Sequence, residues 1–222
     1  MEKYLDVLGR CPLFAGIEKG ELQSMLACLG ACEKSFAKGR AILEEGTPAT
    51  EMGVVLSGRA QVEQSDYFGN RSILASVFPG ELFAESFACA GVSFLPVQVR
   101  AEEESKVLLV DCQRMLTTCS HACAFHGRMI ENLLRIVAHK NLQLHRKAEI
   151  LSRRTTREKV LTYLTEEARR SGSDTFEISF NRQQLADYLA VDRSGLSAEM
   201  SKMKKEGMLD YRKNRFHLLK AE

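Results

Sequence analysis

The sequence predicts an α+β protein with three successive parts: an antiparallel β-rich region, one long helix, and a small C-terminal domain of short helices and a hairpin. Three observations predict this order. Short apolar runs separated by glycines fill residues 36–109, an uninterrupted helical stripe follows over 123–152, and two capped helical segments precede two strands near the C-terminus. Short strands with turn residues every eight to twelve positions or so are typical of antiparallel barrels and sandwiches.

The first 35 residues are expected to be helical in patches, because Leu22, Met25, Leu26 and Leu29 recur at helical spacing. From Phe36 onward the apolar runs become short and strand-like. These runs are Ala41–Leu43, Gly53–Leu56, Gln61–Val62, Ile73–Val77, Leu82–Phe83, Val97–Val99 and Val107–Val110.

Glycines mark the expected corners between these strands, because glycine adopts the positive φ that tight turns require. The corner glycines are Gly39, Gly46, Gly58, Gly69, Gly80 and Gly91, and the last four of them are spaced by eleven residues each. Together with the apolar runs, they predict an N-terminal antiparallel β-roll over residues 1–122.

A coiled-coil seam is predicted along the helix of residues 123–152, because apolar side chains alternate at spacings of three and four. Burial of this stripe against a second copy of the helix would make the protein a homodimer. Asn141 would then fix register and dimeric state. The alternative is that the stripe packs on the chain's own β-roll and that Asn141 is solvated. The seam residues are Ile130, Leu134, Val137, Asn141 and Leu144.

Residues 153–222 are predicted to form a separate domain. A helix over 155–170 and a short strand over 176–180 precede a capping box in which Asn181 begins a helix and Gln184 follows three residues later. Asp192 caps a second helix, Gly207 ends it, and strands over 208–211 and 215–219 follow. Helix, turn, helix and hairpin form a winged helix-turn-helix, which places its second helix in the DNA major groove.

Charge is distributed as this interpretation requires. Residues 1–145 contain 14 Lys/Arg and 17 Asp/Glu, whereas residues 146–222 contain 17 Lys/Arg and 12 Asp/Glu. Positive side chains that neutralise phosphates supply much of the affinity of proteins for DNA. The C-terminal third is therefore expected to bind double-stranded DNA.

Composition argues against a membrane protein, since there is no run of about 18 apolar residues and no apolar signal-peptide core at the N-terminus. A cytoplasmic protein is expected. Its cysteines should then be reduced thiols. They are Cys11, Cys28, Cys32, Cys89, Cys112, Cys119 and Cys123.

This combination resembles the cyclic-AMP receptor protein and FNR (CRP/FNR) family of bacterial transcription regulators over nearly the whole chain. The order and spacing of the motifs carry the resemblance, rather than any single one. The resemblance implies a homodimer that binds a pseudo-palindromic operator, and it implies RNA polymerase as a protein partner. The motifs are CPLFAGI (11–17), Lys38-Gly39, Glu45-Gly46, VLSG (55–58), Pro79-Gly80-Glu81 and NRQQLADYLAVDRSGLS (181–197).

The resemblance also places an effector pocket between the β-roll and the long helix. Nucleotide-binding members carry Gly-Glu followed ten residues later by Arg and Ser or Thr, whereas this chain has Ala84, Glu85, Leu95 and Pro96. Burying a phosphate without a cation is costly, so cyclic AMP is not expected to bind. Either an unidentified, more apolar effector binds, or side chains fill the pocket. The pocket residues are Phe83, Ala84, Glu85, Ser86, Leu95, Pro96, Val97, Leu142 and Gln143.

FNR-type members hold an iron–sulfur cluster on four cysteines. Here the pairs Cys28-x₃-Cys32 and Cys119-x₃-Cys123 lack the tight N-terminal run, and His121 and His126 have no second site at ligand spacing. Buried structural thiols are therefore favoured over a metal or haem site, and no cofactor is assigned.

In the second helix of the C-terminal domain, Arg193 is the candidate base contact, since Arg paired with guanine is the commonest specific contact. Ser194 and Ser197 lie near it, and Lys202 lies further along. Ala198 stands where relatives carry a second base-contacting Arg. Phosphate contacts are expected from Arg182, Lys204, Lys205, Arg212, Lys213 and Arg215.

Two other classes of function compete with DNA binding. One is a sensor or interaction protein with a degenerate pocket, which acts through protein partners or binds DNA constitutively. The other is an enzyme, which is disfavoured because the sequence has no Ser-His-Asp spacing, P-loop or HExxH motif.

Overall fold

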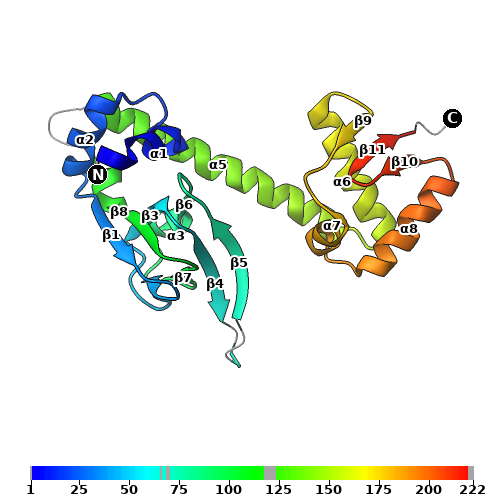
Figure 1. The fold of residues 1–222 in the computed structure, drawn as a ribbon, viewed down its shortest axis with the longest axis horizontal. Helices are drawn as coiled ribbons and strands as arrows, with labels where there is room; N and C mark the ends of the chain where they lie inside the picture. The colour runs from blue at the N-terminus through cyan, green and yellow to red at the C-terminus, as the bar shows by residue number, and fades with distance from the viewer. Residues whose placement is uncertain (1, 66, 69–70, 118–123, 220–222) are drawn as a thin grey trace. The chain divides into compact units, whose positions relative to one another are not determined.

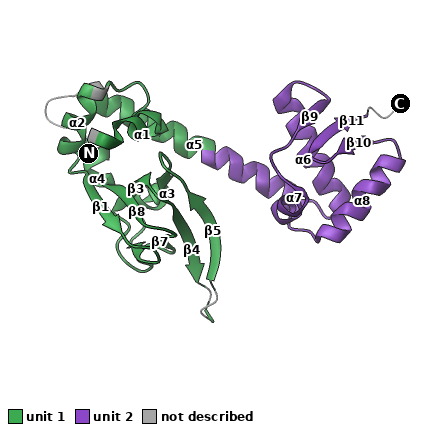
Figure 2. Cartoon of the chain, in the orientation of Figure 1, with its two compact units in different colours: residues 1–139 green, residues 140–222 purple. Residues whose placement is uncertain are grey.

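The structure is a computed structural model, and it describes residues 2–65, 67–68, 71–117 and 124–219. The chain divides into two compact units, residues 1–139 and 140–222 (Figure 2). Helix α5 (Ala124–Ser152) crosses this boundary and contributes residues to both units.

Unit 1 is built on two four-stranded antiparallel sheets (Figure 1). The strand orders are β1-β8-β3-β6 and β2-β7-β4-β5, so each sheet combines strands from distant parts of the sequence. This is the predicted antiparallel roll. Its strands are β1 (Cys32–Phe36), β2 (Ala41–Leu43), β3 (Glu51–Ser57), β4 (Ala60–Ser65), β5 (Arg71–Val77), β6 (Leu82–Phe83), β7 (Gln98–Ala101) and β8 (Ser105–Asp111).

The helical prediction for residues 1–35 is wrong at its end, because β1 begins at Cys32. Its sequence, CEKSF, is mostly polar and has no apolar period. The strand forms because it pairs along its whole length with β8, with Cys32 opposite Leu109 and Phe36 opposite Ser105. As an edge strand it keeps most of its side chains exposed or half-buried, which is why periodicity did not reveal it.

Short helices cover one end of the roll. The apolar face predicted from sequence is present in α2, where Leu22 and Met25 are fully buried with Leu29 just beyond the helix. The short helices are η1 (Glu2–Tyr4), α1 (Leu5–Arg10), η2 (Pro12–Phe14), α2 (Lys19–Cys28), α3 (Glu85–Ala90) and α4 (Cys112–Leu116). The buried Asn132 of α5 donates to the carbonyls of Leu13 and Ala15, and thereby ties the start of α5 to this layer.

The core of the roll has almost no spare space at Gly53 on β3. A Cβ atom at this position would lie 2.0 Å from Cζ of Phe83, whose side chain is itself only 2% exposed. Only glycine allows the ring of Phe83 to lie flat against β3. Positive φ, as predicted, occurs at Gly39, Gly46, Gly58, Gly80 and Gly91, and Gly69 lies outside the described residues.

Unit 2 contains the end of α5, three further helices and a small antiparallel sheet of order β10-β11-β9 (Figure 1). One apolar core joins them, with Leu164, Leu196, Met200 and Phe216 almost completely buried. The elements are α6 (Thr156–Ser171), β9 (Thr175–Glu177), α7 (Arg182–Leu189), α8 (Arg193–Lys205), β10 (Leu209–Arg212) and β11 (Arg215–Leu218). The predicted helices, turn and hairpin are all present.

The predicted seam of α5 is largely uncovered in the single chain. Leu134 is 68% exposed and Leu144 is 66% exposed. Asn141 between them is exposed, whereas Ile130 and Val137 are half-buried. Met129 and Leu133 of the same helix pack in the core of unit 1, and Val137 of the predicted seam packs against that core. The seam therefore does not pack on the chain's own core in the region of Leu134 and Leu144.

None of the helices in the described part of the chain is both long and apolar enough to cross a membrane.

Candidate nucleic-acid interface

The helix-turn-helix is fixed by caps at both of its helix starts. Asn181 Oδ1 accepts from the backbone amide of Gln184, and the backbone amide of Asn181 donates to Gln184 Oε1, which completes the predicted capping box of α7. Asp192 accepts from the amide of Gly195 at the start of α8. Between the helices, Ala190 adopts a left-handed conformation with φ of 49°, which turns the chain sharply. The caps and turn together set the angle between the two helices.

Helix α8 is held from its inner side. Leu196, Met200 and Met203 are fully buried in the core of unit 2. In addition, Arg157 of α6 bridges two carboxylates of this region, with Nε 2.6 Å from Glu199 Oε1 and Nη1 2.8 Å from Glu206 Oε2. Hydrogen bonding to Arg157 lowers the pKa of the Glu206 carboxyl. Because α8 is anchored on this side, its opposite side remains free for a partner.

The free side of α8 carries most of the residues predicted to meet DNA. Arg193, Ser194 and Lys202 are exposed, and Ser197 is half-buried. The hydroxyl of Ser194 donates to Asp192, and that of Ser197 donates to the carbonyl of Arg193 at 2.9 Å. Both serine hydroxyls are therefore left as acceptors. The guanidinium of Arg193 forms no hydrogen bond or ion pair with the described residues of the chain, so its donors face solvent.

The wing supplies a second set of cations. Lys213 stands in the hairpin turn with φ of 57°, a strained value for a residue with a Cβ. Asn214 pins the turn by donating to Glu177 Oε1 at 2.7 Å and to the carbonyl of Ile178 at 3.1 Å. Lys213 and Arg215 are both exposed. Two cations therefore stand at the tip of the hairpin, one in the turn and one at the start of β11.

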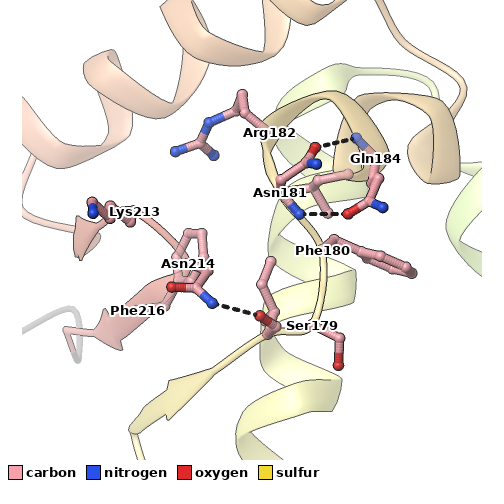
Figure 3. A pocket seen from close by; sticks show the side chains of 10 residues that line it. Ser179, Phe180, Asn181, Arg182, Gln184, Lys213, Asn214 and Phe216 are labelled. Atoms are coloured by element: carbon pink, nitrogen blue, oxygen red, sulfur yellow. Dashed lines mark hydrogen bonds between the residues drawn. The ribbon is translucent and has the colours of Figure 1, made fainter.

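A cleft of about 600 Å³ lies between the N-terminus of α7 and this wing. Figure 3 shows Arg182 and Lys213 on one side of the cleft and Asn214 joined to the segment before α7. Its floor is apolar, and its rim combines cations with amides. The lining residues are Ile178, Ser179, Phe180, Asn181, Arg182, Gln184, Leu185, Lys213, Asn214 and Phe216. This arrangement suits an anionic group that is partly stripped of water.

Arg182 and Lys204 are less free than the sequence indicated. Arg182 is half-buried, its guanidinium lies over the ring of Tyr211, and burial lowers its pKa. Lys204 forms an ion pair with Asp210. Lys205 is exposed. The sequence did not predict a place in this interface for Tyr211 or Ser201, whose hydroxyl groups contact each other. An aromatic residue in a hairpin strand does not reveal from sequence which side chains lie beside it.

Leu95, one of the predicted pocket residues, lies in the apolar core of the roll. Leu95 is 2% exposed and belongs to the same apolar cluster as Phe83, Ala84 and Val99. Its amide donates to the carbonyl of Thr47 at 2.8 Å, and its carbonyl accepts from Gly46 at 2.9 Å. The leucine is thus held in the core by its side chain and by both of its backbone polar groups.

Other predicted pocket residues separate into two groups. Glu85 and Val97 are buried, and Glu85 Oε1 accepts from the hydroxyl of Ser86 at 3.2 Å. Ser86 and Pro96 are exposed. Leu142 and Gln143 lie in unit 2, so their approach to the roll stays a prediction.

The described cysteines are free thiols in contrasting environments. Cys11 and Cys112 are buried, Cys28 and Cys32 are exposed, and Cys89 Sγ lies 3.3 Å from Cys112 Sγ. His126 is buried, and its ring nitrogens have no hydrogen-bond partner among the described residues. No group of three His, Cys, Asp or Glu side chains in residues 2–65, 67–68, 71–117 and 124–219 is arranged to hold a metal ion. Cys119, His121 and Cys123 lie outside the described residues.

Brief treatment of the folded protein with iodoacetamide at neutral pH is expected to label Cys28 and Cys32 and to spare Cys11 and Cys112. Burial raises the pKa of the Cys11 thiol to about 11 and that of Cys112 to about 12, so little reactive thiolate forms. Peptide mass spectrometry measures the labelling, and unfolded protein serves as the control in which all four react. Equal labelling of the four cysteines in the folded protein would contradict this burial pattern.

Two family models match the chain. Residues 33–121 match the cyclic nucleotide-binding domain, and residues 158–222 match the Crp-like helix-turn-helix domain. The matches correspond to the roll and to the domain that carries the cleft. A comparison with proteins of curated function finds no match.

Several solved structures are similar. The Catabolite Activator Protein of Thermus thermophilus is 21% identical with a TM-score of 0.55, and the similarity covers 93% of each chain. The c-di-GMP responsive global regulator CLP of Xanthomonas campestris is 16% identical with a TM-score of 0.54, over 92% of this chain and 100% of its own. The sensor domain of the regulator DNR from Pseudomonas aeruginosa is 17% identical with a TM-score of 0.53, over 69% of this chain and 97% of its own. At these identities the similarity shows a shared fold.

Proposed function

Because the chain belongs to the CRP/FNR family of transcription regulators, we propose that it is a homodimer whose two winged helix-turn-helix domains bind a pseudo-palindromic operator. The observation that carries this proposal is the second helix of the motif, α8, which is anchored on one side and exposed on the other. Its exposed side has Arg193 in the first turn, where base edges come closest in this motif.

Arg193 is the proposed base-contacting residue, with Ser194, Ser197 and Lys202 beside it. The phosphate contacts are assigned to cations on α7, on α8 and on the hairpin of β10 and β11. These are Arg182, Lys204, Lys205, Arg212, Lys213 and Arg215. Phosphate contacts set the position of the protein on DNA, whereas base contacts discriminate between sequences. Two such domains would contact half-sites about one helical turn apart, ~34–36 Å.

Dimerisation is assigned to the seam of α5. An isolated chain would leave Leu134 and Leu144 in water, whereas Val137 between them packs partly against the core of unit 1. Asn141, in the middle of the stripe, would pair with its counterpart and select a two-stranded arrangement. RNA polymerase is the proposed partner at promoters, and the cytoplasm is the proposed compartment.

Control by an effector is one candidate role of the roll. The core position of Leu95 favours a second candidate, in which side chains fill the roll and no effector binds. If the roll binds an effector, that effector is an apolar molecule other than cyclic AMP, next to Glu85, and it shifts the packing of the two α5 helices. If side chains fill the roll, the protein binds DNA constitutively or responds to protein partners. Isothermal titration with cyclic AMP should show no heat of binding under either alternative.

Replacing Arg193 with alanine is expected to remove discrimination at one base pair of each half-site. A bidentate contact between Arg and guanine is worth roughly 1–3 kcal/mol of discrimination, which is about fivefold to 150-fold in affinity. Operator sequences selected from a random duplex library provide the test. The matched variant Lys213→Ala should weaken binding to all duplexes alike and reduce the salt slope by about 0.9 for each phosphate that is no longer neutralised.

If Arg193→Ala weakens binding to all duplexes equally and leaves the sequence preference intact, a residue other than Arg193 makes the base contact. Failure of the wild-type protein to bind any duplex at low salt would instead favour an interaction protein.

A further inference from the structure

Tyr211 lies at the junction of three elements of the winged domain. It stands on β10 opposite Phe216 of β11, and the two rings stack with centroids 5.9 Å apart. Its hydroxyl is 3.4 Å from Ser201 Oγ on α8. The ring therefore connects the wing to the helix that carries Arg193.

Two cations from different helices lie over this ring. The guanidinium carbon of Arg182, at the start of α7, is 5.0 Å from the ring centroid. The ammonium of Lys204, near the end of α8, is 5.5 Å from it. Both distances are within about 6 Å, the range in which an aromatic quadrupole attracts a cation. These are also two of the cations assigned to DNA phosphates.

An aromatic ring holds a cation without using its hydrogen-bond donors. Nη1 of Arg182 donates to Met200 Sδ. A carboxylate partner would occupy further N–H groups of Arg182, whereas a ring attracts the positive charge and leaves them for a phosphate. Lys204 differs from Arg182, because its ammonium also forms an ion pair with Asp210, the residue before Tyr211, and hydrogen bonding to Lys204 lowers the pKa of this carboxyl. An ammonium has three N–H donors, so Lys204 can bind a phosphate while it keeps this contact. Long side chains that are already ordered lose less conformational freedom on binding DNA.

We propose that Tyr211 is a positioning residue for DNA-backbone binding, which holds Arg182 and Lys204 in place to meet phosphates. This inference rests on the proposed function and assigns a role to a residue outside the predicted interface. A purely structural role, in which Tyr211 only packs on Phe216, makes a different prediction for conservative variants.

The test compares Tyr211→Phe with Tyr211→Leu in the full-length protein. Both replacements are apolar and lack the hydroxyl, but only phenylalanine presents a ring to the two cations. The probe is a fluorescent duplex of mixed sequence, since phosphate contacts do not require the operator. Affinity is measured by anisotropy from 50 to 200 mM salt, and thermal unfolding checks that both variants are folded.

Tyr211→Leu is expected to bind about fivefold more weakly than the wild-type protein, and its slope of log K against log salt should be shallower by about 0.9 for each phosphate that is no longer neutralised. Tyr211→Phe should have the same slope as the wild-type protein. In a double-mutant cycle, Tyr211→Leu should have a smaller effect when Arg182 is already replaced with glutamine, because the two residues act together.

Equal slopes for Tyr211→Leu and Tyr211→Phe, or additive effects in the cycle, would overturn the positioning role while leaving DNA binding intact. A wild-type protein that fails to bind the duplex at 50 mM salt would overturn the proposed function, and the inference with it.

Discussion

Replacing both Leu134 and Leu144 with glutamate is expected to convert the protein to a monomer that binds its operator at least about 100-fold more weakly. The two leucines are 68% and 66% exposed in the single chain, so the substitutions disturb little of its own core. In a paired seam they would bury two charges per helix against like charges. A monomer offers one domain to DNA and loses the gain from linked binding, which commonly amounts to 10² to 10⁴ or so.

Analytical ultracentrifugation measures the first effect, and operator binding measures the second. The control is His139→Glu, since this residue is exposed and, at 100° per residue or so, lies on the side of α5 opposite the seam. Persistence of the dimer in the leucine variant would assign dimerisation to another surface. Loss of the dimer in the control would show that charge alone disrupts the helix pair.

Replacing Gly53 with alanine is expected to destabilise the roll by about 3 kcal/mol or to prevent its folding. The added methyl would lie 2.0 Å from Cζ of Phe83 and 2.5 Å from both neighbouring ring atoms, and the ring is too enclosed to move aside. Gly127 of α5 provides the matched control, because no atom lies within 4 Å of its added Cβ. Gly127→Ala should stabilise the helix by about 0.5–1 kcal/mol.

Chemical denaturation followed by circular dichroism measures both changes. Adding Phe83→Leu to Gly53→Ala should recover part of the stability, because the smaller side chain makes room for the methyl. If Gly53→Ala is as stable as the wild-type protein, the close approach of β3 to Phe83 is not what limits this position.

Most of the winged domain could be predicted from sequence, because its elements are specified by local chemistry. Asn181 and Gln184 form their capping box within one turn, and Gly207 ends α8 with φ of 73° where a left-handed residue is needed. Such signals act over three or four residues, so they survive without knowledge of the fold. Strand β1 was missed for the opposite reason, since pairing with β8, far away in the sequence, creates it.

The candidate site was predicted less completely. Sequence identified Arg182 as a surface cation, but the fold places it half-buried over Tyr211, a residue that the hairpin brings back to α7. The same limit applies to the roll. The missing cation at Leu95 was visible in the sequence, whereas its placement in the apolar cluster around Phe83 depends on how the two sheets meet.

The one-sided anchoring of α8 has a consequence for how this protein could acquire new target genes. Its stability depends on Leu196, Met200, Met203 and the bridge from Arg157, none of which lies on the exposed face. Positions such as Ala198 can therefore change while the domain keeps its fold. Selection of operator-switched variants by randomising this face alone should yield folded proteins at high frequency, which makes the domain a suitable scaffold for altered DNA specificity.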